Sequence, residues 1–196
     1  MRDRVVQLAL YFIETRELAL VFRPSPGQTP GPRNTVAFEH WNVSSALNAG
    51  PGLSWGGGCT GVAGSGLVAW KSYAPKKPAD SSGGAELIAA TYQNKFGQGT
   101  RMFAKECRLG ALMPWRFNID AKSTIDGVQM ERVSDSMLYV AARYAMLRYS
   151  EDETKDILIT KCTSSDNTAG SFTKPLIDAD LARSRAQMLG HDVPGA

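Results

Sequence analysis

The order in which strand and helix patterns follow one another is the feature that most restricts how this chain can fold. The segment "TVAFEHWNV" is typical of a strand. After a stretch whose glycines predict a turn, "GVAGSGLVAWKSY" supplies one or two further strands. This part of the sequence therefore predicts a compact antiparallel meander.

A long helical pattern comes next, in "GAELIAATYQNKFGQGTRMFAKECRLG". Gly97 and Gly99 weaken its middle, and Gly110 is a plausible C-cap. The helical spacing predicts five core residues: Leu87, Ala90, Phe96, Met102 and Phe103.

The remaining patterns complete an α/β arrangement. They predict a strand at "WRFNI", a short helix at "AKSTIDGVQM", a longer helix at "DSMLYVAARYAMLRY", a strand at "DILITKC" and a C-terminal helix at "LIDADLARSRAQML". An order of strands, helix, strand, helices, strand and helix indicates a mixed sheet covered by helices.

The chain is long enough for one sizeable core. With 196 residues, 43% of them hydrophobic, it is too short for two full domains. Residues 1–34 instead form an arm, in which a helix and the strand-like "LALVF" precede the proline- and glycine-rich linker "RPSPGQTPGPRN". Charges at both ends of the first apolar run argue against a signal peptide or a membrane span, so we expect an intracellular, cytoplasmic or nuclear protein.

Charge and cysteine content restrict the function only weakly. A net charge of +3 is compatible with a polyanionic partner and is also common in proteins that have none. The three cysteines, Cys59, Cys107 and Cys162, lack the spacing of a structural zinc site, and we interpret them as reduced core thiols.

Two acidic residues stand at the ends of predicted elements. Asp120 follows the apolar strand "WRFNI", where an unpaired buried carboxylate would be costly, so it should meet water, a cation or a metal. Glu86 lies early in the long helix. Taken singly, Glu86 is an ordinary first-turn acid favoured by the helix dipole, and Asp120 is a helix N-cap.

Several fragments, in this order, resemble the ribonuclease H region at the end of the Pol polyprotein of copia-type retrotransposons. The fragments are "YFIETRELALVFRPS", "LVAWKS", "SSGGAELIAA", "IDAKSTI" and "NTAGSFTKPL". The first is similar to the segment that joins reverse transcriptase to ribonuclease H, and the others to elements of the nuclease domain. The resemblance extends from about Arg4 to about Leu189.

The resemblance implies a ribonuclease H-like mixed five-stranded sheet flanked by helices. It also implies hydrolysis of the RNA strand of RNA/DNA hybrids by two divalent metals, Mg²⁺ or Mn²⁺, which clustered carboxylates hold. The family places four acids: on the first strand, early in the first helix, after the fourth strand and at the start of the final helix. Glu86 and Asp120 match the second and third of these positions, as catalytic and metal-binding residues.

The other two family positions lack an acid in this chain. The best placement puts His40 at the first-strand site, with Asn42 where the family often has a second acid, and Gly170 at the final site. Asp166 is a possible compensating acid four residues before Gly170. Because two negative charges are missing, we predict weak or absent occupancy by two metals. A strand histidine without any ligand role remains an equally good interpretation of His40.

Basic and hydroxyl side chains are candidates for contact with nucleic acid. Lys71, Ser72, Lys76 and Lys77 follow the third strand, and Ser123 and Thr124 follow Asp120. They could bind phosphates without sequence preference. Alternatively the lysines form a solvated loop face and the hydroxyls cap a helix. Trp70 and Trp115 are predicted to be core residues rather than stacking platforms.

Two hypotheses follow for the function. In the first, residues 35–190 are a metal-dependent ribonuclease H domain whose activity is weakened because His40 and Gly170 replace two acids. Residues 1–34 are then a reverse transcriptase remnant, and residues 191–196 are a tail. In the second, the chain is a catalytically inactive relic that binds nucleic acid. RNA/DNA hybrid is the expected partner, with the reverse transcriptase part of the same polyprotein as another.

Overall fold

The structure is a computed structural model that describes residues 22, 35–45, 54–75, 79–130, 135–173, 176 and 178–191. The helix predicted for the arm, the predicted strand except for its last residue Phe22, and Lys76 and Lys77 lie outside these residues. None of the helices within the described ranges is long and apolar enough to cross a membrane.

The strands form one mixed sheet, as predicted, in the order β3-β2-β1-β4-β5. They are β1 (Thr35–Ser45), β2 (Trp55–Val62), β3 (Leu67–Tyr73), β4 (Gly110–Ile119) and β5 (Ile157–Lys161). The pairs β1/β2 and β2/β3 are antiparallel, which confirms the predicted meander. The pairs β1/β4 and β4/β5 are parallel, so these three strands end at the same edge of the sheet.

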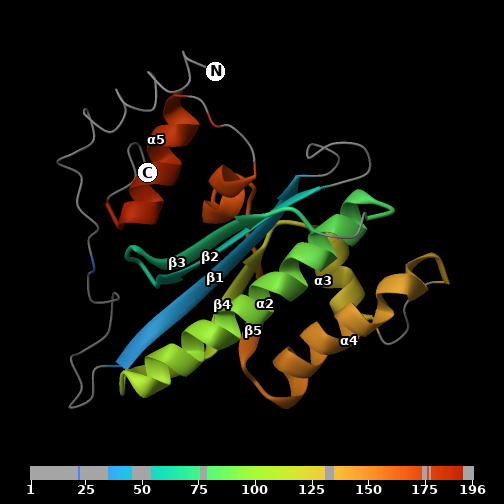
Figure 1. The fold of residues 1–196 in the computed structure, drawn as a ribbon, viewed down its shortest axis with the longest axis horizontal. Coiled ribbons are helices and arrows are strands. Elements are labelled where there is room, and N and C mark those ends of the chain that lie inside the picture. The colour runs from blue at the N-terminus through green and yellow to red at the C-terminus, as the bar shows by residue number, and fades with distance from the viewer. Residues whose placement is uncertain are drawn as a thin grey trace.

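Helices lie on both faces of the sheet (Figure 1). They are α2 (Ser82–Glu106), α3 (Lys122–Gln129), the 3-10 turn η1 (Asp135–Val140), α4 (Ala141–Arg148), the π-helical turn η2 (Tyr149–Glu153), the 3-10 turn η3 (Thr168–Phe172) and α5 (Asp178–Leu189). The longer helix predicted from Asp135 is therefore divided into three geometries.

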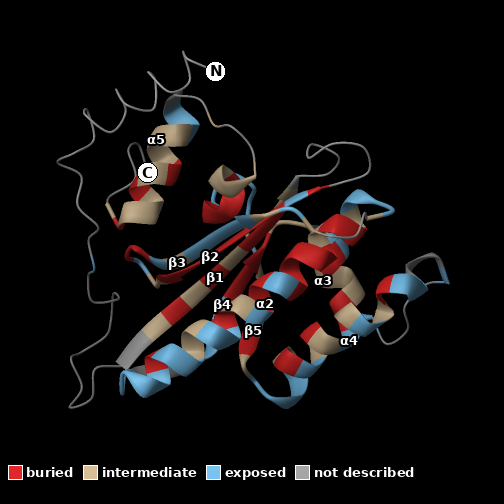
Figure 2. Cartoon of the chain, in the orientation of Figure 1, coloured by how far each residue is buried: buried red, intermediate tan, exposed pale blue. Residues whose placement is uncertain are grey.

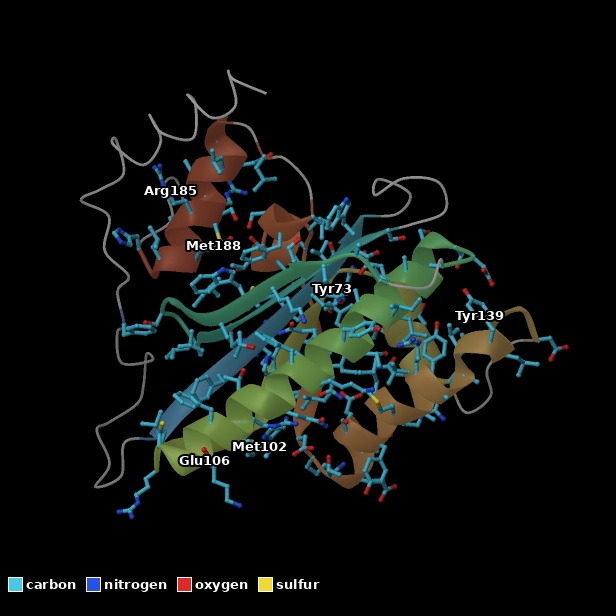
Figure 3. All side chains as sticks on the ribbon, viewed as in Figure 1. Tyr73, Met102, Glu106, Tyr139, Arg185 and Met188 are labelled. Carbon is cyan, nitrogen blue, oxygen red and sulfur yellow. The ribbon has the colours of Figure 1, made fainter. Side chains whose placement is uncertain are left out.

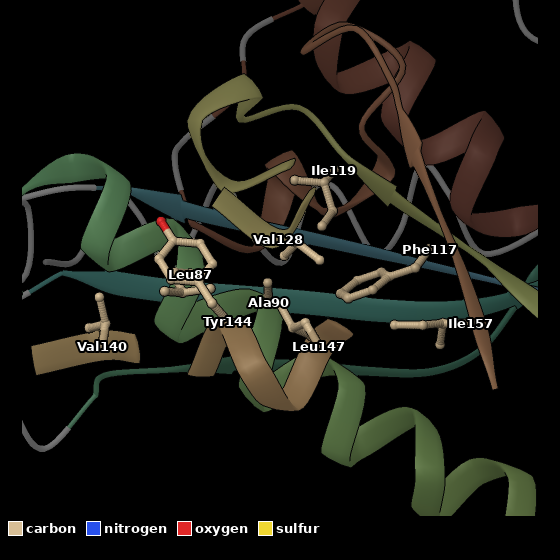
Figure 4. Close-up of a cluster of buried hydrophobic side chains, with 9 residues drawn as sticks. All are labelled: Leu87, Ala90, Phe117, Ile119, Val128, Val140, Tyr144, Leu147 and Ile157. Carbon is tan, nitrogen blue, oxygen red and sulfur yellow. The ribbon is translucent and has the colours of Figure 1, made fainter. Parts of the chain in front are cut away.

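The main core lies between the sheet and the α2, α3 and α4 layer. Nine buried side chains form it, and Figure 4 shows them facing one another: Leu87, Ala90, Phe117, Ile119, Val128, Val140, Tyr144, Leu147 and Ile157. A second cluster on the opposite face joins Val43, Cys59 and Leu67 to Ala169 of η3. Because side chains alternate along a strand, β1 supplies Phe38, His40 and Asn42 to one face and Val43 to the other.

The C-terminal half of α2 is less buried than its pattern predicted (Figure 2). Leu87 and Ala90 are buried as expected, but the prediction was wrong for Met102 and Phe103, which are 66% and 65% exposed. Ala104 in the same part of the helix still packs against Phe38 and Trp115 of the sheet, so this half of α2 is covered on one side only. The predicted C-cap was also wrong, since the helix ends at Glu106 with Cys107 as its cap, and Gly110 begins β4.

The glycine-rich stretch before β3 is a strand and not the turn that its composition suggested. Glycines in β2 let large side chains lie against the backbone. A Cβ on Gly58 would approach Gln93 Oε1 to 2.0 Å, and one on Gly56 would approach Tyr73 Cζ to 2.6 Å. Gln93 of α2 in turn donates a hydrogen bond from Nε2 to the Cys59 carbonyl at 2.8 Å.

Two further burial predictions need correction. Trp115 is fully buried as predicted, but Trp70 is 59% exposed, because it lies on the edge strand β3. All three cysteines are free; Cys59 is a core residue, whereas Cys107 is exposed where α2 ends and Cys162 is half-buried after β5.

Candidate functional site

Glu86 and Asp120 are brought together at the edge of the sheet where β1 and β4 end. The start of α2 lies over this edge, with Ser81 Oγ accepting a hydrogen bond from the Gly84 amide at 3.0 Å. From this first part of the helix Glu86 reaches down to β1. Its Oε1 accepts a hydrogen bond from the Ser44 amide at 2.9 Å, and Asn42 Nδ2 lies 3.5 Å from its Oε2.

The environment of Glu86 favours its neutral form. Burial raises the pKa of this carboxyl group from 4.5 to about 7; the Ser44 hydrogen bonds oppose the rise, and the negative charge of Asp120 adds to it. The influence of Asp120 shows that the two predicted carboxylates share one electrostatic environment. At pH 7 Glu86 is therefore only about half ionised.

Asp120 stands just after β4, as the sequence predicted, and is half-buried. The ammonium group of Lys161, on the neighbouring strand β5, donates a hydrogen bond to the Asp120 backbone carbonyl. Burial raises the pKa of the Cys162 thiol to about 11, and the charges of Asp120 and Asp166 contribute to the rise. Asp120 thus lies between the first part of α2 and the residues that follow β5.

His40, which the resemblance placed at the first-strand site, lies apart from Glu86 and Asp120. It packs beside Gly97, where a Cβ would lie 2.4 Å from His40 Cε1. Gly97 is eleven residues beyond Glu86, about 16 Å along the helix. His40 Nδ1 lies 2.7 Å from Thr60 Oγ1, and its ring is 4.9 Å from that of Trp115.

His40 is a neutral residue of the buried layer. Burial, with a contribution from the Arg101 charge, lowers the pKa of its imidazole to about 3. The ring is 1% exposed, and its Nε2 has no hydrogen-bond partner. The interpretation of His40 as a strand histidine without a ligand role agrees with this environment.

Asn42 is the β1 side chain that meets Glu86. His40 and Asn42 share one face of the strand, so alternation alone could not separate them. The position of α2 along β1 decides that Asn42 lies beside Glu86 and His40 beside Gly97. Asn42 is fully buried, and its Oδ1 lacks a hydrogen-bond partner.

The turn η3 is attached to the same part of β1. The buried side chain of Asn167 donates a hydrogen bond from Nδ2 to the Asn42 carbonyl at 2.8 Å, and its Oδ1 accepts one from the Ala169 amide at 3.1 Å. Gly170 is buried in this turn. Sequence reasoning missed Asn167, although an Asn directly before a short helical turn is a common capping signal.

Asp166 is exposed and is bound locally. Its Oδ2 accepts a hydrogen bond from Thr163 Oγ1 at 2.7 Å. Its negative charge, like that of Asp120, contributes to the raised pKa of the Cys162 thiol.

The predicted nucleic-acid contacts separate into different surfaces. Lys71 is exposed on β3, and its Nζ lies 6.0 Å from the centre of the Tyr73 ring. Ser72 points to the opposite face of the sheet, where its hydroxyl donates to the Phe172 carbonyl at 2.7 Å. Ser123 is exposed near the start of α2, whereas Thr124 is fully buried and cannot reach a phosphate in this conformation.

An aromatic and basic patch crosses α2 close to Glu86. Tyr73, at the end of β3 (Figure 3), contacts Tyr92 of α2 with ring centres 5.2 Å apart. Arg143 of α4 covers the Tyr92 ring with its guanidinium carbon 5.9 Å from the ring centre. With Lys71 these residues form the patch Lys71, Tyr73, Tyr92 and Arg143. Burial raises the pKa of Tyr73, and the Glu86 charge contributes, so patch and carboxylates are electrostatic neighbours.

The donors at this edge do not fit two divalent cations. Within the described residues, no three side chains from His, Cys, Asp and Glu are placed to hold a metal ion. Two carboxylates and the unpartnered Asn42 Oδ1 are hard oxygen donors, which suit a single Mg²⁺ or Mn²⁺. A second dication would need further carboxylates.

Solved structures share this arrangement of strands and helices. The chain is similar to LC11-RNase H1, isolated from compost by a metagenomic approach, with a TM-score of 0.53 and 11% identity over 70% of this chain and 92% of that chain. The fold is ribonuclease H-like. This ribonuclease H-like chain is also similar to the foamy viral protease-reverse transcriptase in complex with RNA/DNA hybrid, with a TM-score of 0.52 and 16% identity over 80% of this chain and 22% of that chain. No protein family and no curated protein matches the sequence.

Proposed function

We propose that the chain is a ribonuclease H domain of a copia-type retrotransposon Pol that hydrolyses the RNA strand of RNA/DNA hybrids at a reduced rate. The observation that carries this proposal is the convergence of Glu86 and Asp120 where β1 and β4 end, in a ribonuclease H-like sheet. In this assignment residues 35–190 are the nuclease domain, 1–34 a remnant of the reverse transcriptase connection and 191–196 a tail.

Two properties of the site account for a reduced rate. Asn42 stands where a first-strand acid would contact Glu86, and Gly170 stands at the final acidic position. Glu86 itself is only partly ionised near neutral pH, which weakens it as a cation ligand. A single divalent cation held by Glu86 and Asp120 would supply positive charge for a phosphate. The Ser44 amide keeps the Glu86 carboxylate in position for this role.

The patch Lys71, Tyr73, Tyr92 and Arg143 is suited to hold the substrate next to this site. Its two cations, Lys71 and Arg143, lie over the rings of Tyr73 and Tyr92 and can pair with the phosphates of a hybrid. Such contacts need neither a particular base nor a second protein, so the patch could bind RNA/DNA hybrids of any sequence. We further propose that the reverse transcriptase part of the same polyprotein is a partner.

The experiment that tests this proposal is cleavage of a labelled RNA/DNA hybrid by the purified chain, with Mg²⁺ and separately with Mn²⁺. We expect slow cleavage of the RNA strand, which the variants Glu86→Gln and Asp120→Asn lose. Cleavage that survives both substitutions would disprove the site.

Restoring the missing acids gives a second test. Asn42→Asp with Gly170→Asp should raise the rate at least about tenfold, because each added carboxylate strengthens cation binding at the reacting phosphate. His40→Asp is the matched control, since it adds a carboxylate on the same face of β1 but beside Gly97. We expect it to destabilise the fold without any gain in rate. Hybrid binding with no cleavage, even after restoration, would instead favour an inactive nucleic-acid-binding relic.

A further inference from the structure

An apolar groove of about 930 Å³ lies at the far end of α2 from the candidate site. Phe96 and Phe103 of α2 form one wall, and Phe38 of β1 and Val68 of β3 form another. Leu109, just before β4, closes the end. Phe22, which precedes β1 in the chain, also lines this groove.

The groove is open to solvent along much of its length. Phe103 is 65% exposed and Phe22 is 54% exposed, so the two aromatic rings do not close it. Exposed apolar surface of this kind marks an interaction site. Met102 is the neighbour of Phe103 on α2 (Figure 3) and is equally exposed, but it does not line the groove.

We propose that this groove is the docking site of the chain's own N-terminal arm, through the segment 17–22, "ELALVF", with Phe22 as its anchor. Phe22 already lies at the groove, and Leu18, Leu20 and Val21 precede it in the sequence. Their burial against Phe103 would remove apolar surface from water on both sides. This inference is independent of the proposed nuclease activity.

The length of the connection permits this docking. Twelve residues separate Phe22 from Thr35 and can span about 40 Å when extended. Thr35 pairs with Gly110, which directly follows the groove residue Leu109. A covalent tether of this length gives the arm an effective concentration on the order of millimolar at the groove, so weak apolar contacts suffice.

Limited trypsin digestion of the full chain tests this docking, because the Arg16–Glu17 bond lies at the start of the segment, whereas Arg23 is followed by Pro24 and is not a trypsin site. Phe103→Asp should speed cleavage after Arg16 at least about tenfold, since it places a charge on the apolar wall. Met102→Asp is the matched control and should leave the cleavage rate unchanged. Phe103 and Met102 are both exposed, so neither substitution should itself lower the melting temperature of the domain by more than about 2 °C. Any further decrease would come from release of the arm.

Coupling between the two sides of the contact completes the test. Phe22→Ala should also speed cleavage after Arg16, and the double variant Phe22→Ala with Phe103→Asp should be cleaved no faster than Phe103→Asp alone. Equal cleavage rates for the native chain and Phe103→Asp would overturn the proposal. A dimer in solution that Phe103→Asp dissociates would also overturn it, because a second copy would then occupy the groove.

Discussion

Burial of Glu86 beside Asp120 makes this carboxyl group titrate in a range where an exposed glutamate is already charged. Its pKa is about 7 in the folded chain and 4.5 as the reference value. Between these two values the folded chain binds more protons than the unfolded chain, so the contribution of Glu86 to stability is greatest at low pH and falls as the pH rises toward 7.

Glu86→Gln should remove this pH dependence, because an amide does not ionise. We expect the variant to gain stability over the native chain between pH 5 and pH 8, on the order of 1–3 kcal/mol. Denaturant unfolding at several pH values measures the difference. Glu106→Gln changes an exposed acid of the same helix and should show no such trend. A constant difference between the native chain and Glu86→Gln would contradict the buried environment.

Two glycines of α2 differ sharply in what a side chain would meet. Gly97→Ala would place a methyl group 2.4 Å from His40 Cε1, whereas no atom lies within 4 Å of a Cβ on Gly99. We expect Gly97→Ala to cost about 1–3 kcal/mol and Gly99→Ala to stabilise the helix by up to about 1 kcal/mol. Chemical denaturation measures the free energy of unfolding of both variants. Adding His40→Ala to Gly97→Ala should recover part of the lost stability, because it removes the ring that the methyl group meets.

The family resemblance selected Glu86 and Asp120 but did not select Asn42, their neighbour on β1. His40 and Asn42 differ by two positions, so both face α2, and a family pattern could be placed on either. The contact between Asn42 and Glu86 joins residues 44 positions apart in the chain. Such a contact depends on how far α2 extends along β1, which no local pattern encodes.

At the scale of elements, one side chain attaches η3 to the sheet. Asn167 is 5% exposed, and its Nδ2 donates to the Asn42 carbonyl. Asn167→Ala would remove this hydrogen bond to a buried carbonyl, at a cost of about 0.5–1.5 kcal/mol.

Hydrogen exchange should show that the stability lost in Asn167→Ala is confined to η3. The amides of η3 should exchange faster, while those of β4 and the first half of α2 change less. Asp166→Ala, at the exposed neighbouring position, should leave exchange in η3 nearly as in the native chain. Uniformly faster exchange across the sheet would mean that η3 is not a separate unit.

The element boundaries show where local signals succeed and where they fail. The start of α2 follows from Ser81, whose hydroxyl caps the helix as an N-cap serine normally does. Its end does not follow from Gly110, because Arg108 adopts the left-handed conformation with φ of 56° and the chain turns two residues earlier. The glycines of β2 are similarly explained by Gln93 and Tyr73, which pack on them from other elements.

For the molecule as a whole, the core between the sheet and the α2, α3 and α4 layer should carry most of the stability. Leu147 of α4 is fully buried in it, whereas Leu158 of β5 is 48% exposed. We expect Leu147→Ala to cost about 2–5 kcal/mol and Leu158→Ala less than about 1 kcal/mol. Unfolding followed by tryptophan fluorescence and by circular dichroism should give one midpoint for each variant. Separate midpoints would show that the two faces of the sheet unfold independently.

The amino-acid sequence by itself determined the order of strands and helices, the antiparallel meander, and the two acids at a helix start and a strand end. These features depend on periodicity and capping within a few residues. The tertiary structure alone decided that Asn42 rather than His40 meets Glu86, that Phe103 is exposed, and that Glu86 titrates near neutrality. Those properties depend on distant segments packing together, because burial and electrostatic environment arise only when the helices cover the sheet.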